Sequence, residues 1–351
     1  MTKPAPRKIA VIGDRFMLSS MFVDALHEHC KLTDLDISTH DLPWPDQPME
    51  HGYEVKGMDG LKEYMGSADE VVKLTGDAEI LVTHLAPLSA SIMERLPNLK
   101  FVAVSRGGPV NIDMKAARER GITVVNTPGR NASAVAEFTI GAILAETRNI
   151  TRGHEGLRRG EYRGELYRAD VTGRELSEMT VGLVGYGEVG RRVVKFLKAF
   201  GCRILVSDPY VQLSADDLRD GVIQCSFDRI LEESDVLSLH PRVTAETTRM
   251  MNAETLRRMK KDATLVNTAR GPLMDYDALY EVMKSGHLRG AMLETFSVEP
   301  VPPDSPLLQL PNVTLTPHIA GASVKTVRYA AGLAAEEVRR YFAGEGPLNR
   351  C

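Results

Sequence analysis

The chain has 351 residues, of which 43% are hydrophobic and 26% charged, and its formal net charge is −4. This length allows two domains with separate cores, and the balance of charges argues against a nucleic-acid or anionic-membrane partner. The four cysteines are scattered and no apolar stretch reaches membrane-spanning length, so we expect no metal site, no membrane contact and a cytoplasmic location.

Short apolar runs alternate with helical patterns along the whole chain. Before residue 130 the expected strands are 8–13, 79–84, 100–105 and 122–126, and segments such as "SASIMERL" and "NIDMKAARERG" are typical of helices. After residue 180 the expected strands are "TVGLVG", "CRILVSD", "DVLSLH", "ATLVNT", "GAMLET" and "VTLTPH". Continuous apolar strands joined by helices predict an α/β fold with two doubly wound parallel-sheet domains.

The middle of the chain contains an unusually apolar helix followed by a charged segment. Residues 132–149 predict a helix that is apolar nearly all round, so it is either an internal packing helix or a subunit interface. Residues 151–176 are rich in arginine, glutamate and glycine. We expect them to form a solvated, charge-paired connection.

The segment "VGLVGYGEVGRRV" (181–193) has the spacing of a dinucleotide-binding turn between a strand and a helix. A tight turn without a ligand would show the same glycines at 185, 187 and 190. The next strand, however, ends in Asp208, where an acid can accept hydrogen bonds from the ribose hydroxyls. Asp208 would repel the extra phosphate of NADP, and no arginine follows it directly, so the sequence favours NAD.

Three ionisable residues follow predicted strands of the second half. They are Arg270, Glu299 and His318. Singly, each has a plain explanation, namely a loop arginine, a solvated glutamate and a hydrogen-bonded histidine. Together with a nicotinamide they fit hydride transfer, in which a guanidinium holds the substrate carboxylate, a histidine supplies the proton and a carboxylate orients the histidine.

Several motifs in order resemble the D-isomer-specific 2-hydroxyacid dehydrogenase family. They are "NTPGRNASAVAEFTIG", "TVGLVGYGEVGRRV", "SDPY", "NTARGPLMDYDAL", "GAMLETFSVEP" and "TPHIAGAS". The resemblance implies an NAD-dependent oxidoreductase for a small D-2-hydroxy or 2-oxo acid of the glycerate, phosphoglycerate or sugar-acid type. In it Arg270 anchors the substrate, His318 is the acid/base and Glu299 is the partner of His318.

The resemblance also implies how the domains are arranged. A Rossmann NAD-binding domain of residues 126–320 would be inserted in a flavodoxin-like substrate-binding domain of residues 1–125 plus 321–351. The helix at 132–149 resembles the family's dimer-forming element, which predicts a homodimer.

The site predicted in this way includes a cofactor set and a substrate set. The cofactor-binding residues are Gly185, Tyr186, Gly187, Glu188, Val189, Gly190, Asp208, His240, Thr247, Thr268, Ala269, Glu294 and His318. The substrate-binding residues are Ser105, Arg106, Gly107, Gly108, Arg270, His318 and His84. A phosphorylated substrate would need further basic residues, for which Arg106 and Arg130 are candidates, although either arginine could pair with a nearby acid instead.

Some positions depart from the family pattern, and they bear on specificity more than on catalysis. The loop "SRGGPVNID" is shorter than usual, Arg242 replaces a common proline, and Glu294 replaces the usual aspartate. A non-catalytic NAD(H)-sensing adaptor resembling the C-terminal-binding corepressors stays open as an alternative function. An NAD-requiring nucleoside hydrolase is disfavoured because no further substrate-contact motif accompanies the glycine turn.

Overall fold

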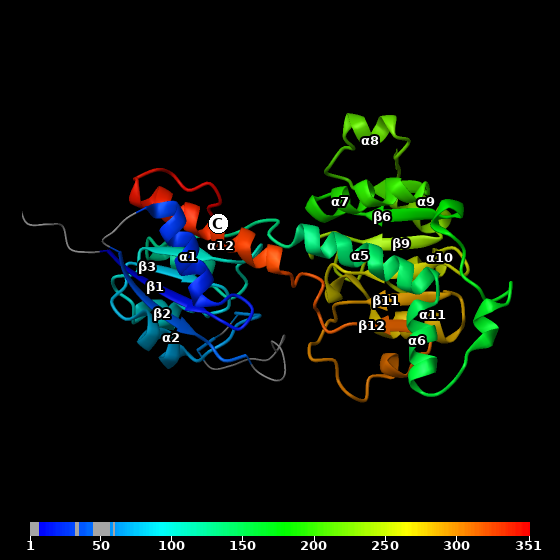
Figure 1. Cartoon of the computed structure of the whole chain (residues 1–351), viewed down its shortest axis with the longest axis horizontal. Helices are drawn as coiled ribbons and strands as arrows, with labels where there is room; N and C mark the ends of the chain where they lie inside the picture. The colour runs from blue at the N-terminus through cyan, green and yellow to red at the C-terminus, as the bar shows by residue number, and fades with distance from the viewer. Residues whose placement is uncertain (1–6, 32–34, 45–56, 59) are drawn as a thin grey trace, which may run out of the picture. The chain divides into compact units, whose positions relative to one another are not determined.

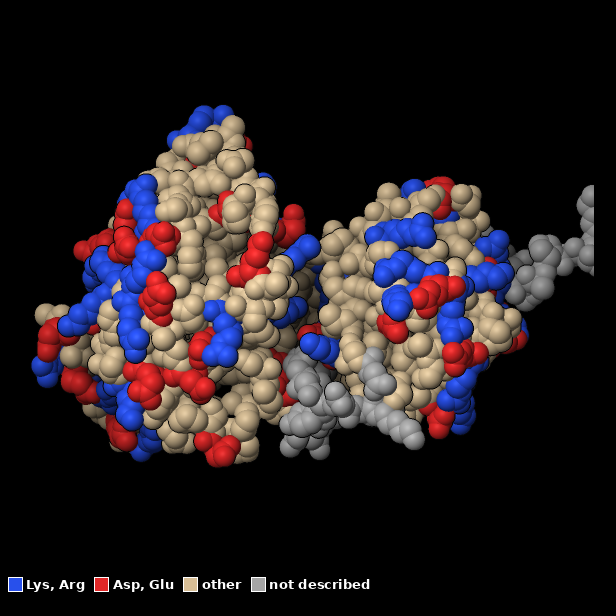
Figure 2. Space-filling model, turned by 180° about the vertical axis from the view of Figure 1, so that it is seen from behind, with Lys and Arg blue, Asp and Glu red and all other residues tan. Residues whose placement is uncertain are grey.

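The computed structural model describes residues 7–31, 35–44, 57–58 and 60–351 of the chain. The chain divides into two compact units, one of Met1–Asn131 with Ala322–Cys351 and the other of Ala132–Gly321 (Figure 1). Within the described ranges, no helix has the length and apolar character needed to cross a membrane. Basic and acidic side chains are interspersed over the face seen in Figure 2, as the small net charge leads one to expect.

The first unit contains a five-stranded parallel sheet with the strand order β2-β1-β3-β4-β5. This order is that of flavodoxin-like doubly wound folds, and it reverses between β1 and β3. The strands are β1 (Arg7–Gly13), β2 (Leu35–Asp41), β3 (Ile80–Thr83), β4 (Phe101–Val104) and β5 (Thr123–Val125). The helices are α1 (Ser19–Cys30), α2 (Ala68–Thr75), α3 (Ala90–Glu94), α4 (Met114–Glu119) and α12 (Val324–Phe342).

Apolar side chains of this sheet are buried on both faces. In β1, Ala10 and Ile12 pack in the cluster that includes α2, α3 and α4, whereas Ile9 and Val11 pack in the cluster that includes α1 and α12. Alternate residues of a strand point to opposite faces, so a continuous apolar strand is covered by helices on both sides. The C-terminal helix α12 packs against α1 and is thereby part of the first unit.

The second unit contains a seven-stranded parallel sheet with the order β12-β11-β10-β9-β6-β7-β8, which reverses between β6 and β9 as in Rossmann folds. The strands are β6 (Thr180–Val184), β7 (Arg203–Ser207), β8 (Ile223–Gln224), β9 (Val236–Leu239), β10 (Thr264–Asn267), β11 (Gly290–Leu293) and β12 (Val313–Leu315). The α-helices are α5 (Ala132–Thr147), α6 (Ile150–Arg158), α7 (Glu188–Leu197), α8 (Ala215–Arg219), α9 (Phe227–Glu233), α10 (Ala253–Arg258) and α11 (Tyr276–Lys284). Short 3₁₀ helices are η1 (Gly164–Tyr167), η2 (Leu176–Glu178), η3 (Lys198–Phe200), η4 (Gly271–Leu273) and η5 (Pro306–Gln309).

The predicted fold class, α/β with two doubly wound parallel sheets, is confirmed. Every strand expected from an apolar run is present, and the helix expected from residue 132 is α5. Two strands were not expected, β2 and β8. The segment 151–176, expected to be a solvated, charge-paired connection, begins within α6 (Ile150–Arg158), which is followed by η1 and η2.

Candidate active site

The glycine turn follows β6, at the point where the strand order of the second sheet reverses. Gly185 has a φ of +96°, and a Cβ there would lie 2.9 Å from the carbonyl carbon of His240, which follows the neighbouring strand β9. A Cβ on Gly190 would collide with the carbonyl oxygen of Gly185. These two positions therefore require glycine for the backbone itself, because a side chain would be strained at one and would not fit at the other.

Gly187 differs from the other two glycines because a Cβ there would meet no atom within 4 Å. It is the N-cap of α7, and among the described residues no acceptor is bonded to the backbone amides of residues 187–190. These amides point out of a helix N-terminus whose dipole favours negative charge. Open space beside unpaired amides fits a bound pyrophosphate, so the residues present suit a dinucleotide.

Asp208, directly after β7, accepts hydrogen bonds from a backbone amide of the glycine turn and from two amides of its own loop. Its Oδ2 accepts a hydrogen bond of 2.7 Å from the amide of Tyr186, and its Oδ1 accepts bonds from the amides of Tyr210 and Val211 at 2.9 and 3.0 Å. Asp208 thus fixes the glycine turn, a function that the sequence did not reveal. A carboxylate accepts about four hydrogen bonds, so these three leave capacity for a ribose hydroxyl.

The remaining predicted cofactor residues of the second unit follow β9 and β10. Burial lowers the pKa of His240 to about 4, so its ring, 3.0 Å from the Ser238 hydroxyl, is neutral at neutral pH. Thr247 donates to the carbonyl of Arg242 at 2.6 Å, and Thr268 is hydrogen-bonded to Thr139 of α5 at 2.7 Å. The two threonine hydroxyls therefore have partners inside the protein.

Arg270 lies in the loop after β10, and the buried Asn267 shapes this loop. The Asn267 side chain accepts a bond from the amide of Ala269 at 3.1 Å and donates to the carbonyl of Arg270 at 3.0 Å. A Cβ on Gly271 would collide with the backbone of Phe296, so this loop packs directly against the one that follows β11. The Arg270 side chain is exposed, with Nη1 donating to the Ala269 carbonyl at 2.8 Å.

Glu299 and His318 come together at the ends of β11 and β12. His318 Nδ1 is 2.8 Å from Glu299 Oε2, and Glu299 Oε1 accepts the amide of Phe296 at 2.8 Å. The carboxylate also lies within electrostatic reach of the Arg270 guanidinium. The three ionisable residues selected from the sequence thus belong to adjacent loops of one unit.

Hydrogen bonds to Glu294 stabilise the turn that carries His318. His318 has a φ of +54°, a left-handed conformation that costs a non-glycine residue energy and requires support from its surroundings. Its amide donates to the carbonyl of Glu294 at 3.0 Å, and the buried Glu294 carboxylate accepts bonds from the Thr316 hydroxyl and the Ala320 amide. Burial raises the pKa of Glu294, and these hydrogen bonds oppose the rise.

The residues predicted to bind substrate in the first unit follow β3 and β4. Ser105 and Arg106 are buried, whereas Gly107 and Gly108 are exposed and, within the described part of the chain, their amides donate no hydrogen bond. Arg106 forms an ion pair with Glu63 and donates to its carbonyl at 3.1 Å. His84 is buried.

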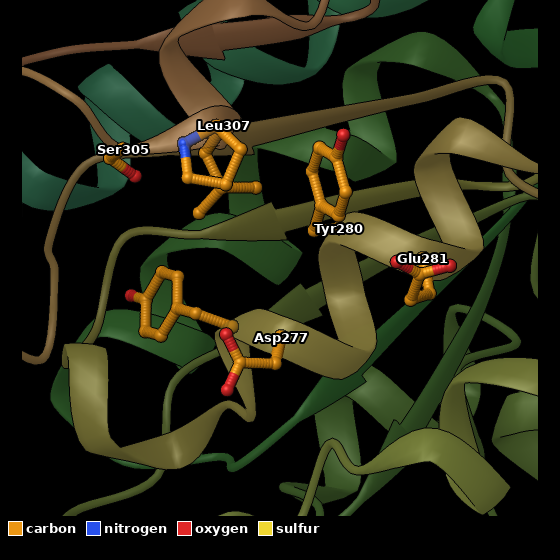
Figure 3. A pocket seen from close by; sticks show the side chains of 7 residues that line it. Asp277, Tyr280, Glu281, Ser305 and Leu307 are labelled. Atoms are coloured by element: carbon orange, nitrogen blue, oxygen red, sulfur yellow. The ribbon is translucent and has the colours of Figure 1, made fainter.

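The second unit contains a hollow beside the start of α11 (Figure 3). Its lining is formed by Tyr276, Asp277, Tyr280, Glu281, Ser305, Pro306 and Leu307. The sequence did not single out Tyr276, whose hydroxyl donates to the carbonyl of Thr295 at 2.7 Å and so braces the loop that leads to Glu299. Its only signal in the sequence was its place near the start of the helix after Arg270.

The glycine turn and the sheet order define a dinucleotide-binding α/β protein, and comparisons with known proteins narrow this class. Residues 140–320 match the family model described as "D-isomer specific 2-hydroxyacid dehydrogenase, NAD binding domain". A glyoxylate reductase of Thermofilum pendens is 38% identical over 287 residues, covering 82% of this chain and 85% of that protein. A hydroxypyruvate reductase of Thermotoga maritima is 38% identical over 278 residues, covering 78% and 87%.

Among solved structures, the TT0316 protein from Thermus thermophilus has a TM-score of 0.78 and 32% identity and covers 97% of this chain and 99% of its own. The chain belongs to the D-isomer specific 2-hydroxyacid dehydrogenase family. It is an NAD-dependent oxidoreductase of that family, so the resemblance, the enzyme class and NAD as the cofactor are confirmed.

Proposed function

We propose that the chain interconverts a small 2-oxo acid and its D-2-hydroxy acid, with His318 as the acid/base. The observation that carries this proposal is the 2.8 Å contact between His318 Nδ1 and Glu299 Oε2, beside the loop of Arg270. In line with the family model, the unit of Ala132–Gly321 would hold NAD and the unit of Met1–Asn131 with Ala322–Cys351 would bind substrate.

Arg270, Glu299 and His318 each have one task in the proposed reaction. The cofactor, when bound, supplies or accepts a hydride at the carbon of the substrate carbonyl. Arg270 binds the adjacent carboxylate, since a planar guanidinium matches a carboxylate with two parallel hydrogen bonds. Glu299 accepts a hydrogen bond from Nδ1–H of His318, so the proton to be transferred lies on Nε2, and His318 donates it to the carbonyl oxygen as the hydride arrives.

The cofactor site of this proposal uses the unpaired amides of residues 187–190 for the pyrophosphate. Asp208 would accept a ribose hydroxyl in addition to the amides that it already binds. His240, Thr247, Thr268, Ala269 and Glu294 stay predicted cofactor neighbours. For Glu294 the proposal gives a second task, because its carboxylate holds the turn of His318.

The test is the oxidation of NADH with a panel of 2-oxo acids, namely glyoxylate, hydroxypyruvate, pyruvate and phosphohydroxypyruvate. The His318→Ala variant should lose about 10²–10⁴-fold in kcat, whereas His27→Ala, which removes an exposed histidine of α1, should match the wild type. If NADH binds and no acid is reduced, or if His318→Ala keeps its activity, the proposal is wrong.

We also infer a cytoplasmic homodimer. Apolar and aromatic side chains are exposed along α6 and the segment after it, with exposed fractions of 58% for Ile150, 61% for Leu157, 89% for Tyr162 and 94% for Tyr167. Such a concentration is typical of a protein interface. The four cysteines are free thiols, as in a reducing compartment. Light scattering should give the mass of a dimer for the wild type and of a monomer for Leu157→Glu.

A further inference from the structure

A continuous chain of hydrogen bonds leads from Tyr276 to His318. The Tyr276 hydroxyl donates to the carbonyl of Thr295 at 2.7 Å. The amide of the next residue, Phe296, donates to Oε1 of Glu299 at 2.8 Å. Oε2 of the same carboxylate is 2.8 Å from Nδ1 of His318. The chain thus joins the first residue of α11 to the histidine that the proposed function uses as its acid/base, and all of it lies within the unit of Ala132–Gly321.

The middle of this chain is a single peptide group, formed by the carbonyl of Thr295 and the amide of Phe296. The group is trans, so its C=O and N–H lie in one plane and point in opposite directions. Tyr276 therefore holds one edge of the plane, and the Glu299 carboxylate accepts a hydrogen bond from the other edge. Successive hydrogen bonds also polarise one another, so the hydroxyl strengthens the bond that the amide donates.

Tyr276 is itself fixed by the start of its helix. The N-cap of α11, Asp275, accepts the amide of Ala278 at 3.1 Å, and its own amide donates to the carbonyl of Met251 at 2.9 Å. The Tyr276 ring packs against the apolar cluster of the second unit, with its centre 6.2 Å from that of the Phe296 ring. Capping and packing thus hold the side chain from which the hydroxyl donates.

Tyr276 acts as a hydrogen-bond donor and not as a second acid. Burial raises its pKa, and the negative charge of Glu299 raises it further. The hydroxyl therefore keeps its proton over the pH range in which enzymes are assayed. Since this proton is used in the bond to the Thr295 carbonyl, Tyr276 can influence the reaction only through the peptide group.

We propose that Tyr276 is a positioning residue for the acid/base pair, which it holds through the Thr295–Phe296 peptide group. The inference rests on the proposed function, in which Glu299 accepts from Nδ1–H of His318. A carboxylate with a hydrogen bond on each oxygen keeps the imidazole in one orientation and tautomer. Without the hydroxyl the peptide plane would turn more freely, and the carboxylate would hold the imidazole in the reactive orientation for less of the time.

The kinetic test compares two tyrosines of α11. Tyr276→Phe removes the hydroxyl and keeps the ring, so kcat for the 2-oxo acid should fall about 3- to 10-fold, the effect of one lost hydrogen bond. KM for the acid and Kd for NADH should stay within twofold of the wild type. The control is Tyr280→Phe, because Tyr280 lies one turn further along the helix, in the lining of the hollow and outside the hydrogen-bonded chain (Figure 3). Equal kcat in the two variants overturns the proposal.

A double-mutant cycle shows whether Tyr276 acts through Glu299. Glu299→Ala removes the carboxylate, so in that background the peptide amide has no acceptor to orient. Tyr276→Phe should then change kcat less than twofold, whereas independent effects would multiply. If Tyr276→Phe lowers kcat by the same factor with and without the carboxylate, the loss comes from a general change in the loop and a positioning role is contradicted. Thermal unfolding reports whether the variants are folded.

The His318→Ala variant in the same assay keeps this inference separate from the proposed function. If His318→Ala loses its activity while Tyr276→Phe retains that of the wild type, the inference fails and the proposed function stands. If no 2-oxo acid is reduced, or if His318→Ala keeps its activity, the proposed function is wrong and the inference fails with it.

Discussion

Gly187 and Gly185 are two residues apart, yet the structure predicts opposite consequences when each is replaced by alanine. At Gly187 a Cβ would meet nothing within 4 Å, and the φ of −77° suits alanine. The cost of alanine at an N-cap, about 1 kcal/mol, is offset in part by the lower entropy of the unfolded chain. We therefore expect the free energy of unfolding of Gly187→Ala to stay within about 1 kcal/mol of the wild type.

Gly185→Ala should instead destabilise the protein. A φ of +96° costs a residue with a Cβ about 1–2 kcal/mol. The new Cβ would also lie 2.9 Å from the carbonyl carbon of His240 and 3.0 Å from the nitrogen of Pro241, both backbone atoms. Forcing them apart adds about 1–3 kcal/mol, so the total loss should be roughly 2–5 kcal/mol.

The affinity for NADH should fall in Gly187→Ala, although the stability of this variant should change little. A methyl group on Gly187 would occupy the space beside the unpaired amides of residues 187–190, and each lost hydrogen bond to a charged phosphate is worth about 1.5–3 kcal/mol. Calorimetric titration with NADH should therefore give a Kd raised about 10- to 100-fold for Gly187→Ala. Gly346→Ala, another glycine with open space at its Cβ, serves as the control. NADH affinity within threefold of the wild type in Gly187→Ala would refute the placement of the pyrophosphate at these amides.

Three further predictions concern the ionisable residues. Glu299→Gln exchanges the acceptor of the His318 Nδ1 proton for an amide, so kcat in the NADH assay should fall about 10²–10⁴-fold with little change in the Kd for NADH; a kcat near that of the wild type would exclude Glu299 from the mechanism. Arg270→Lys keeps the charge and loses the planar fork, so steady-state kcat/KM for 2-oxo acids should fall roughly 10- to 100-fold, and an unchanged value would contradict its role as anchor. Acidification should destabilise the fold, because burial lowers the pKa of His84 from its usual 6.5, so that below this pH the unfolded chain binds more protons than the folded one. Asp14 acts in the same sense at lower pH, since its hydrogen bonds to His84 and to backbone amides outweigh burial and lower its pKa from 3.8. The free energy of unfolding in urea should fall between pH 6.5 and 5 with a slope from His84 of at most about 1.4 kcal/mol per pH unit, and the slope should be smaller in His84→Gln; equal slopes would contradict this account.

Most of the strands that sequence patterns predicted are buried on both faces, and the edge strand β12, which is only partly buried, is an exception. β1, β3 and β4 are continuous apolar runs because helices cover both sides of the sheet. β2 was missed because "LDISTHD" alternates apolar and polar residues and is mostly exposed at the edge of the sheet. α6 was missed for a related reason. It contains two glycines, and its apolar residues Ile150 and Leu157 are exposed, so no buried stripe marks it as a helix.

Position at the ends of strands was enough to select Arg270, Glu299 and His318, but not to find what supports them. The supporting contacts are hydrogen bonds between different loops and helices, such as the one that the Tyr276 hydroxyl donates to the Thr295 carbonyl. Such contacts depend on how the loops pack. Arg106 illustrates the same limit. Its ion pair with Glu63 joins segments more than forty positions apart in the printed sequence, and nothing in the local pattern distinguishes Arg106 from Arg130.

The pairs His318–Glu299 and His84–Asp14 share the same contact but differ in their surroundings. His318 and His84 both direct Nδ1 at a carboxylate, at 2.8 and 2.7 Å. The His318 side chain is 26% exposed and that of His84 is 5% exposed. An arginine donor at Nε2, the Nη2 of Arg130 at 3.0 Å, together with burial keeps the His84 ring neutral, whereas the proposed reaction uses the more exposed His318 ring as its acid/base. Substitution of Arg130 is therefore the change that would show whether His84, once released, begins to titrate.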